Sequence, residues 1–237
     1  MLHSVKQMYG NKLGASDGEI GHVKDVYFDD QKWAIRYLVA DTGAWLSQRQ
    51  VLIPPHALVA LYEPGKLLLV DLSRKQIEDS PSIETHLPVS RQYEEEYYRY
   101  YGWPYYWQGD GLWGVSSSQL WGLKPDNLTD DLPTLSRLQR DGPEAHLRSA
   151  QSVSGYHVNA SDGEIGHVCD FMVDDQSWTI RQLVIKTERQ FSGKEVAIPT
   201  RDIGRISYAE STLFVSLTRE SIEQRSTRGL HLVGAVP

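Results

Sequence analysis

The chain has 237 residues, a formal net charge of −7 at pH 7 and one cysteine. The acidic balance argues against a nucleic-acid-binding protein, which needs surplus Lys and Arg to neutralise phosphates. A single cysteine excludes an internal disulfide framework and suits a reducing compartment. There is no apolar run long enough for a transmembrane helix and no signal-peptide core at the N-terminus, so the sequence predicts a cytoplasmic protein.

A nine-residue sequence, Ala-Ser-Asp-Gly-Glu-Ile-Gly-His-Val, occurs at residues 15–23 and again at 160–168. The match continues without a gap, at an offset of 145, from Gly10/Gly155 to Glu78/Glu223. Such a duplication predicts two copies of one small fold, here called copy one and copy two. Each copy of about 70 residues can bury only a small core, so we expect it to pack against its partner or the linker.

The elements of copy one follow from period-two apolar patterning and turn residues. An extended piece at 12–15 and a hairpin turn at 16–18 precede strands at 19–28, 33–41, 50–53 and 66–72, and Ser73 caps a helix at 74–79. Gly21 indicates a bulge or a close backbone approach. Short strands separated by turns predict a mainly β fold, with one small closed or half-closed barrel in each copy.

Between the copies the composition changes sharply. Residues 93–121 hold 11 of the 24 aromatic residues. A helix is predicted at 91–101, with Tyr93, Tyr97, Tyr100 and Tyr101 on one face, and Gly102 and Pro104 end it. Residues 108–145, rich in Gly, Ser, Asp and Pro, read as loop or disorder.

Copy two repeats the plan of copy one. Strands are expected at 164–173, 178–186, 194–198 and 212–217, followed by a helix that begins at the Thr218 cap and runs to residue 223. The predicted organisation is therefore a first barrel at 1–80, an aromatic helix and linker at 81–148, a second barrel at 149–225 and a tail at 226–237.

The repeated segments resemble the PRC-barrel domain. The resemblance rests on Asp17 to Val23, Asp25, Asp29-Asp30 and Trp33 to Val39, with their counterparts Asp162 to Val168, Asp170, Asp174-Asp175 and Trp178 to Val184. The segments Pro88 to Tyr93 and Tyr98 to Pro104 are similar to the linker of bacterial proteins that carry two such domains. This small β-barrel is shared by the cytoplasmic part of the photosynthetic reaction centre H subunit and the C-terminal domain of a ribosome maturation factor. The resemblance implies a docking or assembly module, with no reaction assigned to the barrel.

Residues kept in both copies are candidates for structural roles. They are Asp17, Gly18, Gly21, His22, Asp25, Trp33 and Arg36 in copy one, and Asp162, Gly163, Gly166, His167, Asp170, Trp178 and Arg181 in copy two. His22 and His167 could bind a metal, but neither a Cys pair nor a His-x-x-x-His motif accompanies them, so strand histidines and no metal site are expected. The acidic turns lack the ligand spacing of a calcium loop. Asp25 and Asp170 are predicted to pair across strands with Arg36 and Arg181.

Nothing in the sequence matches an enzyme or phosphate-binding signature. Cys169 aligns with Lys24 and has no base beside it in sequence, which favours an ordinary free thiol. We therefore expect a non-enzymatic protein without a cofactor, while leaving open an enzyme whose site assembles from distant residues.

The aromatic segment has several interpretations. Tyr and Trp are enriched in protein interfaces, and the candidate partner-binding residues are Trp103, Tyr105, Tyr106, Trp107, Trp113 and Trp121. Stacking on single-stranded nucleic acid is opposed by the acidic character of residues 82–149. A membrane-surface patch would favour basic flanks. The remaining interpretation, which we favour for the tyrosine face of the helix, is that it docks on a barrel within the same chain.

The function predicted from these features is that of a protein-binding scaffold or adaptor with an unidentified protein partner. Two similar surfaces also suit bivalent binding or a homo-oligomer such as a homodimer. Two alternatives are a small-ligand or ion-binding sensor that uses the barrel mouths and, by family analogy, a factor associated with a photosynthetic electron-transfer complex.

Overall fold

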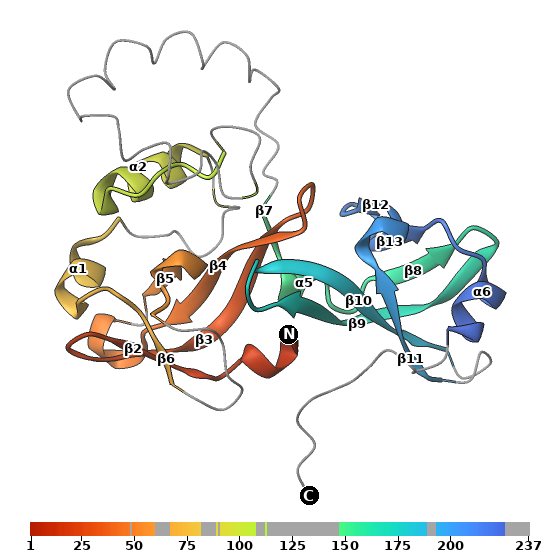
Figure 1. Ribbon diagram of the computed structural model, residues 1–237, viewed down its shortest axis with the longest axis horizontal. Coiled ribbons are helices and arrows are strands. Elements are labelled where there is room, and N and C mark those ends of the chain that lie inside the picture. The colour runs from red at the N-terminus through yellow and green to blue at the C-terminus, as the bar shows by residue number, and fades with distance from the viewer. Residues whose placement is uncertain are drawn as a thin grey trace, which may run out of the picture. The chain divides into compact units, whose positions relative to one another are not determined.

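In a computed structural model, the described residues are 1–47, 49–59, 67–81, 89, 91–107, 112, 147–188 and 193–225. They belong to two compact units. One unit holds both copies of the repeat, within Met1–Asp79 and Leu147–Pro237, and the other lies within Ser80–His146. Figure 1 shows the elements of each unit along the chain.

Copy one forms a curled antiparallel sheet, as the alternation of apolar residues predicts. Its strands are β2 (Lys12–Ala15), β3 (Gly18–Asp29), β4 (Ala34–Asp41) and β5 (Gln50–Ile53). The short β6 (Leu68–Leu69) returns parallel to β2, and the helix α1 (Arg74–Asp79) follows. The 3-10 turns η2 (Gly43–Leu46) and η3 (Pro55–Ala57) flank β5. The cap predicted at Ser73 is confirmed, since its hydroxyl accepts a hydrogen bond from the Gln76 amide at 3.2 Å.

Copy two repeats this topology. Its elements are β8 (His157–Ala160), β9 (Gly163–Asp174), β10 (Thr179–Thr187), β11 (Glu195–Pro199), η6 (Thr200–Asp202), β12 (Ile203–Ser207), β13 (Thr212–Val215) and α6 (Arg219–Gln224). β13 runs parallel to β8, as β6 does to β2. The sequence did not predict β12, but its pairing of Ile203 with Val215 corresponds to the bridge between Leu58 and Val70 in copy one. The prediction of a mainly β fold made of two similar curled sheets is confirmed.

The two copies exchange their N-terminal arms. β1 (Leu2–Ser4) and the 3-10 turn η1 (Lys6–Met8) precede copy one, yet β1 pairs with β9 of copy two. β7 (Leu147–Ser149) and the short helix α5 (Ala150–Val153) precede copy two, yet β7 pairs with β3 of copy one (Figure 1). The duplication therefore extends back to Leu2/Leu147, and each arm completes the opposite copy.

A short ladder joins the two sheets where β4 and β10 begin. Ala34 lies opposite Thr179, the Ile35 amide donates to the Trp178 carbonyl at 2.8 Å, and the Ile180 amide donates to the Trp33 carbonyl at 2.7 Å. The contact from Ile35 to Trp178 is repeated, with the two copies interchanged, by the contact from Ile180 to Trp33. This reciprocity is the pattern of an isologous interface between identical subunits. The fold is thus a homodimer-like pair contained in one chain.

The second unit contains α2 (Arg91–Tyr101), with the bounds predicted from the sequence. Within this unit Tyr97 is buried and its ring contacts those of Tyr93, Tyr101 and Trp103. Tyr100 is exposed, although the helical spacing placed it on the same face. Docking of the tyrosine face on a barrel stays a prediction.

Candidate functional site

The retained hairpin anchors the last helix of its own copy. The Asp17 carboxylate accepts a hydrogen bond from the Arg74 amide at 2.7 Å, and Asp162 accepts one from the Arg219 amide at 2.8 Å. A carboxylate is favourable there because the first amides of a helix have no partner within the helix. The repeated Asp in the hairpin turn therefore has a structural role at the start of α1 and of α6.

The glycine after the hairpin allows two backbone segments to touch. A Cβ atom built on Gly21 would lie 1.9 Å from the Asp41 carbonyl oxygen, and one on Gly166 would lie 2.1 Å from that of Lys186. A register shift in the β2–β3 ladder also marks a bulge beside Gly21. Both features anticipated at this position are present, and together they explain why glycine occurs here in both copies.

Asp25 holds the arm of copy two, contrary to the predicted pairing with Arg36. Its carboxylate accepts hydrogen bonds from the Ser149 hydroxyl at 2.5 Å, the Gln151 amide at 3.1 Å and the Val26 amide at 2.7 Å. Burial raises the pKa of Asp25, and these hydrogen bonds act in the opposite direction.

Asp170 makes the equivalent contacts with the arm of copy one. Its carboxylate accepts from the Ser4 hydroxyl, from the Lys6 amide at 3.0 Å and from the Phe171 amide at 2.7 Å. The predicted pairing of Asp170 with Arg181 is therefore also wrong. The two retained aspartates instead attach the two exchanged arms.

A β-bulge explains why Asp25 and Arg36 do not meet. Tyr27 lies opposite Tyr37 and Phe28 lies opposite Ile35, which makes Arg36 the extra residue in the ladder. Its guanidinium is fully buried and donates to Asp29 at 2.9 Å. Burial alone would raise the pKa of Asp29, but hydrogen bonds from Arg36 and from two backbone amides hold it below its ordinary value.

The same bulge occurs in copy two with a different outcome. Ile180 and Gln182 have partners in β9, and Arg181 is the extra residue between them. Its guanidinium lies 3.7 Å from Asp174, yet 53% of its side chain is exposed, against 0% for Arg36. The retained arginine is therefore buried in the core of copy one, as Arg36, and exposed on the surface of copy two, as Arg181.

Lys24 and Cys169 also occupy equivalent bulges, where a register shift leaves one residue without a partner. The extra residue of a bulge has no residue opposite it in the ladder. Burial, with the charges of Glu195 and Asp170 adding to it, raises the pKa of the Cys169 thiol to about 12. Cys169 is a free cysteine, and a thiol with this pKa is protonated at neutral pH.

The predicted histidines line strand surfaces. His22 and His167 are both exposed and lie opposite Lys12 and His157 in their ladders. Within the described ranges no group of three or more His, Cys, Asp or Glu side chains is arranged to hold a metal ion.

His22 does border a pocket of about 490 Å³ in copy one. Its charged and aromatic lining includes Lys12, Glu19, Asp41, Trp45 and Arg74. The Trp45 indole donates to the Ile20 carbonyl at 2.6 Å, and the Arg74 guanidinium lies over its ring, 4.3 Å from the centroid. The pocket is thus formed by the retained hairpin and by Arg74, which copy two retains as Arg219, together with Lys12, Asp41 and Trp45, which copy two replaces by other residues.

The candidate partner-binding residues that can be placed form one aromatic cluster around Tyr98. Its ring contacts those of Trp103, Tyr105, Tyr106 and Trp107. Tyr106 is buried, and its hydroxyl donates to the buried Glu94 carboxylate at 2.7 Å. Trp103, Tyr105 and Trp107 remain partly exposed. Trp113 and Trp121 lie outside the described residues.

Sequence reasoning missed the contacts that hold the arms. Arg148 pairs with Asp30 at 3.0 Å, and His3 contacts Asp175 at 3.0 Å in the equivalent place. Tyr208 adds to the first pair, since its hydroxyl donates to Asp30 and the Arg148 guanidinium lies over its ring. The signal was present in Ser4/Ser149 at the offset of the repeat, but two or three matching residues are too few to stand out.

None of the helices in the described part of the chain has the length and apolar character needed to span a membrane. A search of curated proteins found no match. The family model of the PRC-barrel domain matches residues 13–76 and 149–222, which together make up more than half of the sequence. The chain therefore belongs to the PRC-barrel family and carries the domain twice.

Proposed function

We propose that the protein is a non-enzymatic scaffold or adaptor that binds another protein through its aromatic cluster, defined as Tyr98, Trp103, Tyr105, Tyr106 and Trp107. The observation that carries the proposal is the partial exposure of Trp103, Tyr105 and Trp107 around the buried ring of Tyr98. Clustered aromatic rings supply large contact areas at a low cost in side-chain entropy and dominate many interfaces. Tyr106 supports the cluster from inside, because its hydroxyl is bonded to Glu94.

The retained residues support the same conclusion indirectly. Asp17, Gly21, Asp25 and their counterparts have contacts that position helices, strands and arms. Residues committed to the fold in both copies do not distinguish this protein from other proteins built from the same domain. Its particular function is then best sought in features that occur once, and the aromatic cluster is one of them.

Replacing Trp103, Tyr105 and Trp107 together with alanine should abolish capture of the native partner. The interface would lose its aromatic anchors, and a loss of this kind typically exceeds about 2 kcal/mol of binding free energy for a single hot spot. Quantitative affinity capture from the native host, comparing the wild type with the variant, measures the effect.

The matched control is Leu67→Ala with Leu69→Ala, which removes exposed apolar area from copy one instead. It should retain the partner. If the aromatic variant keeps its melting temperature and captures the same proteins in the same amounts, the assigned surface is wrong.

A second candidate, a small-ligand sensor, is favoured by the pocket beside Trp45 and Arg74. The Arg74 guanidinium suits a small molecule with an anionic group, Trp45 offers an aromatic wall, and the other basic side chain, Lys12, is paired with Glu19 at 3.2 Å. Arg74→Ala should then remove a bound mass that native mass spectrometry detects on protein purified from its host. Arg219→Ala, at the same helix position of copy two, should leave that mass in place. Wild-type protein without any bound small molecule or metal would argue against the sensor.

The remaining expectations are less specific. A cytoplasmic location and a homodimer are both compatible with the proposal, and sedimentation analysis would measure the latter. Association with a photosynthetic electron-transfer complex rests on family analogy alone, and co-purification with such a complex would be its test.

A further inference from the structure

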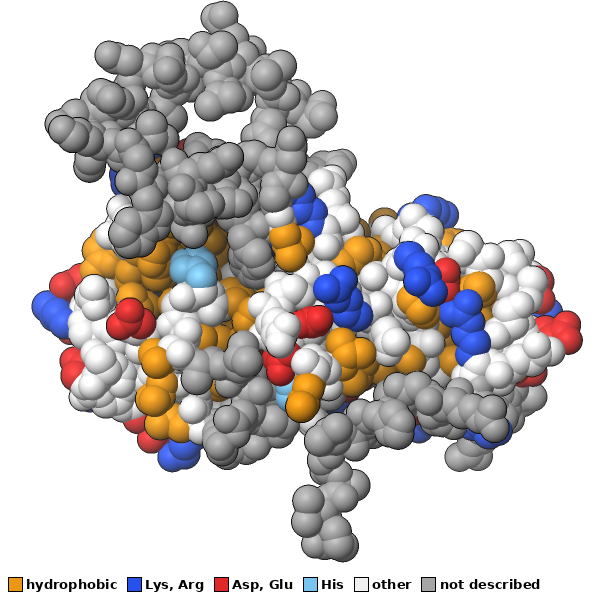
Figure 2. Space-filling view, in the orientation of Figure 1, with side chains coloured by type: hydrophobic (Ala, Val, Ile, Leu, Met, Phe, Trp, Pro, Cys, Tyr) orange, Lys and Arg blue, Asp and Glu red, His pale blue; other side chains and the backbone are white. Residues whose placement is uncertain are grey.

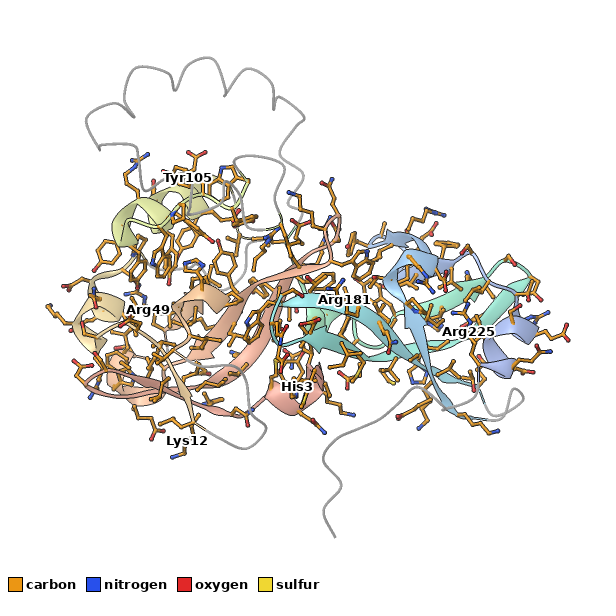
Figure 3. All side chains as sticks on the ribbon, viewed as in Figure 1. His3, Lys12, Arg49, Tyr105, Arg181 and Arg225 are labelled. Carbon is orange, nitrogen blue, oxygen red and sulfur yellow. The ribbon has the colours of Figure 1, made fainter. Side chains whose placement is uncertain are left out.

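Four arginines of copy two surround the turn η6. The Thr200 hydroxyl donates to the backbone carbonyl of Arg181 at 3.4 Å, and the Asp202 carboxylate pairs with Arg225 at 2.8 Å. Arg201 lies in the turn itself, and Arg205 lies on β12 directly after it. We call them the arginine surface: Arg181, Arg201, Arg205 and Arg225. Figure 2 shows Lys and Arg side chains gathered on this face of copy two, and Figure 3 labels Arg181 and Arg225.

The arginine surface is only partly neutralised. Arg225 is well paired with Asp202, whereas Arg181 lies 3.7 Å from Asp174 and is half exposed. Arg201 and Arg205 are exposed, and among the residues the structure describes neither makes an ion pair. The Arg205 guanidinium lies 4.0 Å from the centroid of the Phe214 ring, a contact that holds it over the sheet. Guanidinium groups held in this way bind carboxylates with two parallel hydrogen bonds.

The sequence of copy one does not repeat this group of arginines, so the fold does not require it. The positions that correspond to the four arginines are occupied by Arg36, His56, Ala60 and Ser80. Arg36 is fully buried against Asp29 and offers no charge to solvent. Three exposed arginines and a fourth that is half-exposed, in one copy of a duplicated domain and within a chain of net charge −7, therefore indicate a role particular to copy two.

The same region contains an edge strand. In the described part of the sheet β12 is at one end of the strand order and hydrogen-bonds with β13 alone. Its other edge carries backbone N–H and C=O groups that a further strand could pair with. Arginines beside such an edge repel basic segments and favour acidic ones, which gives the edge its selectivity.

We propose that β12 and the arginine surface bind an acidic segment of another protein, which adds to the sheet as an extended strand. The inference rests on the proposed protein-binding function and assigns it a second surface. The edge strand offers a ladder of backbone hydrogen bonds, which only a peptide can match. Nucleic acids and anionic membranes lack the backbone N–H and C=O groups that would continue the sheet at β12.

The test uses the full chain and a fluorescein-labelled peptide of four alternating Val-Glu pairs, followed by fluorescence anisotropy at low ionic strength. The wild type should bind this peptide and should not bind the Val-Lys peptide of the same length. Arg201→Glu with Arg205→Glu should weaken binding at least about tenfold, because two charge-assisted contacts become repulsive. Methylation of alternate backbone nitrogens in the peptide should also abolish binding, since a methylated nitrogen cannot donate to the strand.

The charge-matched control is Lys24→Glu with Lys32→Glu, which reverses two exposed cations of copy one and should leave binding unchanged. Melting curves of both double variants show that they are folded. The inference is overturned if the Val-Glu peptide fails to bind, if reversal of Arg201 and Arg205 leaves its affinity unchanged, or if the methylated peptide binds equally well. Arginine-dependent binding of phosphatidylserine vesicles or single-stranded DNA in place of the peptide would overturn it too.

The variant lacking Trp103, Tyr105 and Trp107 separates this inference from the proposed function. It should bind the Val-Glu peptide like the wild type, since its changes lie outside the arginine surface. If the peptide fails to bind while that variant loses its native partner, only the inference about β12 is wrong. If the peptide binds as expected and the aromatic variant keeps all its partners, the aromatic surface is wrong and the arginine surface stands.

Discussion

Replacing Gly21 with alanine should destabilise the protein by about 3–5 kcal/mol, the largest effect expected of a methyl group added at any glycine that the structure describes. The added Cβ would lie 1.9 Å from the Asp41 carbonyl oxygen, which belongs to the backbone of β4 and cannot rotate away. A φ of +145° adds strain for any residue with a side chain. Thermal unfolding followed by circular dichroism should show a fall in melting temperature of about 10 °C or more.

Gly43→Ala is the matched control for this prediction. Gly43 also has a positive φ, +58°, but a Cβ there would have no neighbour within 4 Å. Its cost should be limited to the strain of a left-handed conformation, about 1 kcal/mol. Equal losses in the two variants would show that the close approach of β3 and β4 is not what requires glycine.

Replacing Asp25 with alanine should cost about 2–3 kcal/mol, because it removes the acceptor of three hydrogen bonds, two of which attach the arm of copy two. The Val26 amide is buried and would lose its partner without gaining water. Chemical denaturation measures the loss. Hydrogen exchange should also become faster at the amides of Gln151 and Ser152, which lie in a different copy of the repeat from the substitution.

Asp25→Asn tests whether the carboxylate or its shape matters. The amide oxygen can still accept from the Val26 and Gln151 amides, so the loss should be smaller than with alanine. Since burial raises the pKa of Asp25, the folded state favours the protonated carboxyl. The wild type should therefore gain stability relative to the Asn variant as the pH falls from 7 through the raised pKa of the folded state. A difference that is constant with pH, or one that shrinks, would contradict this assignment.

Local patterning was sufficient for most of the elements within each copy, although the strand predicted at 66–72 is limited to β6 (Leu68–Leu69). The strands around Ile20 and Ile35 alternate apolar residues, and Ser73 and Thr218 mark the starts of the two short helices; all are present as predicted. β12 was not predicted, because its five residues, Ile-Gly-Arg-Ile-Ser, contain a bulge at Gly204 and do not alternate regularly between apolar and polar side chains.

The sequence alone could not predict which side chains pair between strands. The prediction that Asp25 meets Arg36 assumed an unbroken ladder, whereas a bulge at Arg36 turns its side chain toward Asp29. The sequence also could not predict that Arg36 is buried and Arg181 exposed, since both residues occupy the same motif and the same bulge.

The sequence by itself determined that the chain contains two similar β domains, because a repeat of about 70 residues with alternating apolar positions has few other ways to bury its core. Only the tertiary structure decided that the arms are exchanged and that the copies pair like identical subunits. The arms, residues 2–8 and 147–153, carry too little sequence pattern to choose between the near copy and the far one. That choice depends on where Asp25 and Asp170 lie in space, and on the ladder between Ala34 and Thr179 that brings the two copies together.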